Sequence, residues 1–139
     1  MATARVSGFE LAGQQLSRMG RPMIRKIVEA GAGAAEKAWR ENIRENQHVR
    51  TGDMLASVGT NEYREYLGGG SVDVYPQGED RNGVRNADKA YVINYGRGGT
   101  RKRGKMGDKF ITGNEDKTET AIVDAMQAES DRLIEELNR

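Results

Sequence analysis

The chain of 139 residues has the length of one domain, but only 36% of its residues are hydrophobic and 6% are aromatic. Charged residues make up 31%, so the composition predicts a subunit that exposes much of its surface or completes its core against partners. The absence of cysteine excludes disulfides and thiolate metal sites.

The sequence indicates a protein that does not enter a membrane. Spanning a bilayer takes about 20 consecutive apolar residues, and every apolar run in this sequence is shorter. Its first residues lack the apolar stretch of a signal peptide. We therefore expect synthesis and use in the cytosol.

The net charge of +1 is unevenly distributed along the chain. Residues 1–50 carry +4, residues 51–78 carry −3, residues 79–114 carry +5 and residues 115–139 carry −5. Such blocks favour an electrostatically guided contact between unlike regions, within one subunit or between neighbours. Solvated faces of ordinary helices explain the same blocks equally well.

Two helices are expected in the first part of the chain. Ser7 and Glu10 form a capping box in a short helix within residues 1–20. A long helix is predicted over residues 22–45, because apolar residues recur there at helical spacing. The small residues around 31–33 either let another backbone approach closely or kink the helix at its two glycines.

An antiparallel hairpin is expected in the middle of the chain. A helical turn capped by Thr51 leads into a strand over residues 58–66, and residues 71–75 alternate with the period of a second strand. The apolar residues 90–95 are too few for their period to decide between a strand and a helical turn.

The C-terminal part is expected to hold a short strand and a helix. The strand is predicted over residues 110–112, and Asp116 with Glu119 forms a capping box before an amphipathic helix. The prediction for residues 1–139 is therefore a single α+β domain. In it, the N-terminal helices and the C-terminal amphipathic helix pack on a small antiparallel sheet, with a long, mobile basic loop over residues 97–108.

This basic loop is the candidate functional segment, because loops of about 12–15 residues or more are commonly functional or disordered. Its cations are Arg97, Arg101, Lys102, Arg103, Lys105 and Lys109. Three interpretations stay open: the loop faces DNA in a channel, it docks on an acidic neighbour such as the helix over residues 116–138, or it is a solvated loop.

Motifs typical of catalysis do not occur in the sequence. His48 is the single histidine and cannot supply a zinc site by itself, so it is expected to be a solvated residue at a helix end. The serines lack a Gly-x-Ser-x-Gly context, and residues 96–102 lack the Gly-Lys-Ser/Thr ending of a phosphate loop. We therefore expect no enzyme, no cofactor and no metal.

Several short motifs follow one another in a characteristic order. The positions concerned are Thr51, Gly52, Met54 and Ser57, then Tyr91, Tyr95 and Gly96, and finally Phe110. Together with the Ala-rich helix before them, they resemble the tail-completion, or head–tail joining, proteins of long-tailed phages. In that family a Thr-Gly-x-Leu-x-x-Ser segment, a Tyr-Ala-x-x-Val-Glu-x-Gly-like segment and a Phe-containing strand are typical. Here Met54 takes the place of the leucine and Asn94 that of the acid, and the Pro-rich approach to the strand is missing.

The resemblance implies a structural virion subunit, made in the host cytoplasm, that forms a ring, commonly a hexamer, in the phage neck. Its implied partners are copies of itself, head-closure or connector proteins, and tail terminator or tail-tube proteins, with possible non-specific contact to channel DNA. A tail terminator, which caps the tail tube, is a close alternative. A small nucleic-acid-binding accessory protein that uses the basic loop is an alternative of another class.

Overall fold

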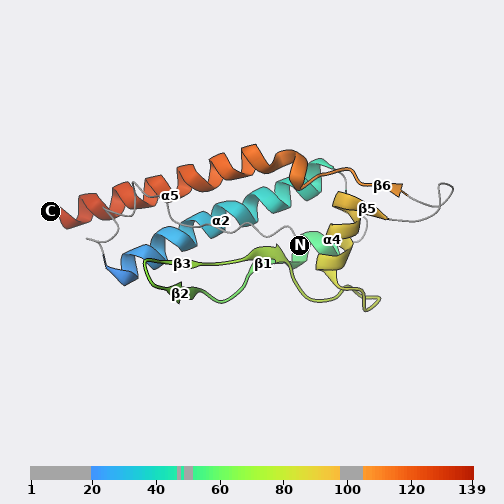
Figure 1. Cartoon of the computed structure of the whole chain (residues 1–139), viewed down its shortest axis with the longest axis horizontal. Coiled ribbons are helices and arrows are strands. Elements are labelled where there is room, and N and C mark those ends of the chain that lie inside the picture. Colours follow the sequence, from blue (N-terminus) through green and yellow to red (C-terminus); the bar gives the residue numbers. More distant parts are fainter. Residues whose placement is uncertain (1–19, 47, 49–51, 98–104) are drawn as a thin grey trace.

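Two long antiparallel helices form the body of the molecule (Figure 1). The computed structural model describes residues 20–46, 48, 52–97 and 105–139. Helix α2 spans Arg21–Glu45 and helix α5 spans Glu115–Leu137. Because α5 packs along one side of α2 and a β-hairpin contacts α2 from another side, α2 lies between them. This arrangement confirms the predicted α+β class, while the helix expected within residues 1–20 lies outside the described residues.

The two glycines of α2 have different surroundings. A Cβ on Gly31 would lie 2.8 Å from Cγ of Met126 and 3.4 Å from Cγ2 of Ile122, both on α5, whereas a Cβ on Gly33 would meet nothing within 4 Å. Gly31 therefore gives α5 room to pack closely on α2. The helix continues through both glycines, so the alternative of a break at this point is wrong.

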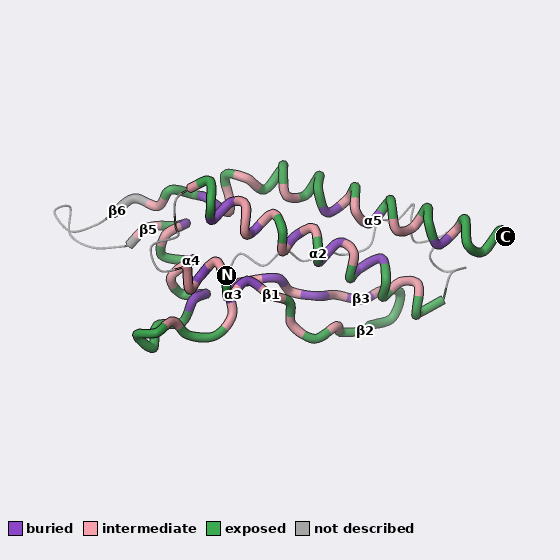
Figure 2. The backbone as a smooth tube through the Cα atoms, turned by 180° about the vertical axis from the view of Figure 1, so that it is seen from behind, coloured by how far each residue is buried: buried purple, intermediate pink, exposed green. Residues whose placement is uncertain are grey.

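The predicted hairpin is present as two short antiparallel ladders. Strand β1, Val58–Thr60, pairs with β4, Val74–Pro76. Strand β2, Arg64–Tyr66, pairs with β3, Gly69–Ser71. The buried positions alternate along the second half of the hairpin and form the side that packs on α2 (Figure 2).

A bulge separates the two ladders of the hairpin, because residues 61–63 lie opposite residues 72–73. The Asn61 side chain closes this bulge. Its Nδ2 donates to Oδ2 of Asp73 at 2.9 Å, and its Oδ1 accepts from the Asp73 backbone N–H at 2.7 Å. The hairpin is thereby held as one unit although its register shifts.

Two short helices connect the hairpin to the rest of the molecule. Helix α3, Asp53–Ser57, follows Gly52, whose φ is 77°, and the predicted cap Thr51 lies outside the described residues. Helix α4 spans Asn86–Tyr95. The apolar segment that was open to either structure is therefore helical, and its inward positions recur at helical spacing at Ala87, Ala90 and Asn94.

The strand expected over residues 110–112 is wrong. Phe110 and Ile111 lie in a turn, and a 3₁₀ helix, η1, spans Thr112–Asn114. The cause is the side chain of Asn94, whose Oδ1 accepts from the backbone N–H groups of Ile111 at 3.0 Å and Thr112 at 3.1 Å. These donors are then not available to a strand ladder.

The capping box predicted at the start of the last helix is also wrong. Helix α5 begins at Glu115 and its N-cap is Asn114, which makes no side-chain capping hydrogen bond. Because η1 leads directly into α5, Asp116 lies within the first helical turn. It can still favour the helix there through the helix dipole.

Candidate assembly surface

The basic segment predicted as a loop begins and ends in a short hairpin. Strand β5, Gly96–Arg97, pairs antiparallel with β6, Lys105–Met106, so that Arg97 faces Lys105 across the ladder. The ends of the predicted loop are thus strands, because their backbones pair with each other. Its other predicted site residues Arg101, Lys102 and Arg103 lie outside the described residues, and the exposed Lys109 follows β6.

The base of the β5–β6 hairpin is attached to the C-terminal end of α4. Gly107 lies so close to the backbone of Asn94 and Gly96 that a Cβ would not fit. The backbone N–H of Asp108 donates to the Ile93 oxygen at 3.0 Å, and that of Lys109 to the Asn94 oxygen at 3.1 Å. The position of the basic hairpin is therefore fixed by α4.

A histidine–carboxylate contact joins this base to the end of α2. His48 Nε2 is hydrogen-bonded to Asp108 Oδ2, and the other carboxylate oxygen accepts from the Phe110 backbone N–H at 3.0 Å. The His48 ring also packs edge-on against Phe110 at 4.9 Å between centroids, which leaves its side chain 20% exposed. The expectation of a solvated histidine is wrong, because Asp108 and Phe110 come from a distant part of the sequence.

Phe110 and Asn94 form the interior of this end of the molecule. Phe110 is 1% exposed, and its ring lies edge-on to Trp39 of α2 at 6.2 Å. Asn94 is completely buried, and no hydrogen-bond partner for its Nδ2 is found among the described residues. The residue in the place of the family's acid is therefore an acceptor for backbone N–H groups inside the protein.

The outward side of α4 carries an exposed patch, which we call the α4 face and define as Tyr91, Val92 and Tyr95. These side chains are 49%, 37% and 52% exposed. The two tyrosine rings lie 4.8 Å apart between centroids and border a shallow hollow that Pro76 and Ile111 also line. Tyr91 and Tyr95, predicted from the resemblance alone, are thus brought together on one accessible surface.

The other motif positions have structural roles in this molecule. Met54 is buried in the core, and Ser57 Oγ donates to its backbone oxygen at 2.7 Å. Gly52 and Gly96 lie at helix ends with φ of 77° and 89°, a conformation that favours glycine.

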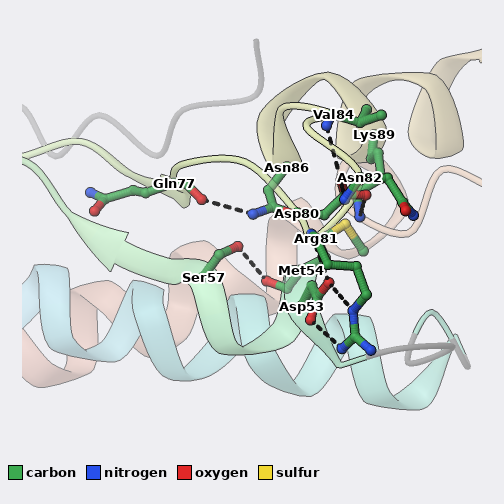
Figure 3. Close-up of polar contacts among 10 residues, drawn as sticks. All are labelled: Asp53, Met54, Ser57, Gln77, Asp80, Arg81, Asn82, Val84, Asn86 and Lys89. Carbon is green, nitrogen blue, oxygen red and sulfur yellow. Dashed lines mark hydrogen bonds and ion pairs between the residues drawn. The ribbon is translucent and has the colours of Figure 1, made fainter.

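Polar contacts hold the segment before α4 against α3 (Figure 3). Arg81 donates through Nε to Oδ2 of Asp53 at 2.9 Å and through a terminal nitrogen to Oδ1 at 2.8 Å. These hydrogen bonds from Arg81 hold the pKa of Asp53 well below its ordinary value. The charged form of Asp53 is therefore part of the folded structure.

A second aspartate organises the turn that leads into α4 (Figure 3). Oδ1 of Asp80 accepts from the backbone N–H groups of Asn82 at 2.8 Å and Val84 at 2.9 Å, while Oδ2 accepts from Lys89 Nζ at 2.8 Å. The hydrogen bonds from Lys89 and Val84 lower the pKa of Asp80. Because Lys89 belongs to α4, this contact helps to position the α4 face.

Comparison of the chain with family models, curated proteins and solved structures finds no match. Within residues 20–46, 48, 52–97 and 105–139, no group of three or more side chains is placed to hold a metal ion. No helix in the same ranges is long and apolar enough to cross a membrane.

Proposed function

We propose that the chain is a non-enzymatic structural subunit that assembles with copies of itself. The observation that carries this proposal is the α4 face. Exposed aromatic side chains that adjoin a hollow are typical of the centre of protein interfaces, where tyrosines contribute much of the binding energy. Two of the chain's five tyrosines lie on this one face.

The place of assembly that we propose is the neck of a long-tailed phage, where the subunit would act in tail completion or head–tail joining. This part rests on the resemblance of the sequence motifs. The α+β order of long helix, hairpin and C-terminal helix supports it, since the resemblance implies the same order. The partners would be further copies in a ring, a connector or head-closure protein, and a tail terminator or tail-tube protein. A role as the tail terminator itself is the close alternative.

Nucleic-acid binding is a second candidate, favoured by the β5–β6 hairpin. Its two strands are connected in the sequence by residues 98–104, which contain three cations, and a cationic segment of this kind can contact phosphates without reading bases. Replacing Arg101, Lys102 and Arg103 by glutamine tests this role. A salt-dependent retention on DNA that the triple variant loses would support it, whereas unchanged retention or no retention would exclude it.

The experiment for the main proposal measures mass in solution by light scattering and native mass spectrometry. The wild type is measured alone and with connector and tail-tube proteins, beside Y91D/Y95D and the control A128D, whose site is exposed on α5. We expect defined oligomers from the wild type and A128D, and monomers from Y91D/Y95D. A wild type that stays monomeric in every mixture would contradict self-assembly.

A further inference from the structure

We infer that the turn of the β2–β3 hairpin in one copy binds the α4 face of the next copy. This turn, residues 66–69, is called the hairpin tip below. The inference rests on the proposed self-assembly and names the two surfaces that meet. It makes the contact heterologous, with one surface of each kind on every subunit.

The hairpin tip presents apolar side chains that have no place in the subunit's own core. Leu67 is 101% exposed and Tyr66 is 48% exposed. Turns favour glycine, proline, asparagine, aspartate and serine, each for a backbone reason that leucine does not share. The leucine at this position is therefore explained better by a partner than by the turn.

The geometry of the turn holds the Tyr66 ring in a defined position. Tyr66 and Gly69 pair across the ladder, and Gly68 between them has a φ of 85°. The Tyr66 ring covers Gly69, since a Cβ there would lie 3.1 Å from Cε2 of Tyr66. Tyr66 therefore loses little side-chain freedom on binding, because its ring is already placed.

The α4 face offers a surface of complementary character. Its two tyrosine rings border a shallow apolar hollow, whose other lining residues include Tyr75, Pro76 and Ile111. The hollow has room for only about one water molecule, so a projecting leucine would lie over its apolar rim while Tyr66 packs beside the tyrosines of α4. Aromatic side chains of this kind often pair across an interface.

The two surfaces lie at opposite ends of the elongated subunit (Figures 1 and 2). The β2–β3 hairpin lies near the start of α2 and α4 near its end, and α2 has 25 residues. At about 1.5 Å per residue, such a helix is roughly 37 Å long. The hairpin tip therefore cannot reach the α4 face of its own subunit, and repetition of the contact closes a ring when the rotation permits.

The two sequence blocks that hold these surfaces differ in net charge. Residues 51–78, which hold the β1–β4 hairpin, carry one basic and four acidic side chains, whereas residues 79–114, which hold α4, carry nine basic and four acidic ones. Among the described exposed side chains, the hairpin carries Glu62 and Glu65 beside Arg64. Near α4, exposed Arg85 and Lys109 lie among exposed acids such as Asp88. The difference in charge between the two blocks favours an encounter of unlike surfaces over one of two hairpin tips.

Cysteine cross-linking tests the pairing directly, because the chain has no cysteine of its own. L67C and V92C are purified separately, mixed and oxidised mildly, beside a mixture of L67C with A128C. We expect the L67C–V92C mixture to give a cross-linked heterodimer in at least tenfold excess over the control. Equal yields in the two mixtures would overturn the inference.

A complementation experiment tests the same contact without cross-links. L67D lacks a functional hairpin tip and Y95D lacks a functional α4 face, so neither should assemble alone. Their mixture should form a 1:1 dimer and nothing larger, because only one intact tip and one intact face remain. Circular dichroism checks that both variants fold, as expected for substitutions at exposed sites.

The outcomes separate this inference from the proposed function. A wild type that forms oligomers while neither the cross-link nor the 1:1 dimer appears would overturn the pairing and leave self-assembly in place. A wild type that stays monomeric and gives no selective cross-link would overturn both. A selective cross-link with a monomeric wild type would support the pairing as a weak contact that further neck proteins must stabilise.

Discussion

Helix α5 packs on α2 through apolar side chains at helical spacing, whereas α4 and the base of the β5–β6 hairpin are held by hydrogen bonds of single polar residues. Ile122, Met126 and Leu133 are the buried side chains of α5. At the other region, Asn94 and Asp108 hold the backbone of the turn after the hairpin. A packed helix interface changes gradually with side-chain volume, but a buried hydrogen bond is either made or lost. The second region should therefore depend on fewer residues, while it leaves the tyrosines of α4 free for a partner.

The largest effect is expected at Phe110, which joins the two regions by packing against Trp39 and His48. Removing a buried phenylalanine ring costs about 3–5 kcal/mol, so Phe110→Ala should lower the free energy of unfolding by this amount. Urea denaturation measures the loss. Tyr95→Ala is the control, because its ring is half-exposed and its removal should change stability little. Equal losses in the two variants would contradict the central position of Phe110.

A smaller effect is expected when the acceptor inside the α4 region is removed. Asn94→Ala leaves the backbone N–H groups of Ile111 and Thr112 without their side-chain acceptor. An unpaired buried donor costs about 1–3 kcal/mol, and because both residues are only partly buried we expect a total loss of about 2 kcal/mol.

Hydrogen exchange shows whether this loss arises where the structure places it. The amides of Ile111 and Thr112 should exchange faster in Asn94→Ala, while amides in the middle of α2 should change only as far as global stability changes. Uniform acceleration along the whole chain would indicate general destabilisation and contradict a local role of Asn94.

The helix interface gives the next prediction, with the same substitution at two glycines of one helix. Gly31→Leu overfills the contact with Met126 and Ile122, which costs about 1–3 kcal/mol. The better helix propensity of leucine offsets up to about 1 kcal/mol of this cost. The control Gly33→Leu meets no neighbour within 4 Å, so it should gain about 1 kcal/mol instead. Opposite signs in thermal unfolding would confirm the packing at Gly31, and equal shifts would refute it.

This comparison also explains how far the sequence predicts the structure. The long helices and the hairpin follow from repeated spacing over many residues, and the structure contains them. The turn at Phe110 depends on Asn94, which accepts a hydrogen bond from the distant Ile111. The role of His48 depends on Asp108, which is likewise distant in the sequence. Such contacts leave no period in the sequence. The resemblance singled out the tyrosines of α4 as candidates, whereas Leu67 was not singled out, because a single exposed leucine in a turn becomes informative only when its position in the fold is known.

The smallest effect is expected from the ion pair of Asp53 and Arg81, which ties the segment before α4 to α3 and is open to solvent on the arginine side. Arg81 lowers the pKa of Asp53 in the folded state, so the unfolded chain binds a proton more readily. The pair therefore contributes its full stability above the ordinary aspartate pKa of about 3.9, and this contribution is lost as the pH falls further toward the folded pKa.

Asp53→Asn should lower the melting temperature at pH 7. It should also make the melting temperature fall less when the pH is lowered to 3. Asp124→Asn, exposed on α5, is the control. A parallel pH dependence of wild type and Asp53→Asn would show that this contact does not couple protonation to folding.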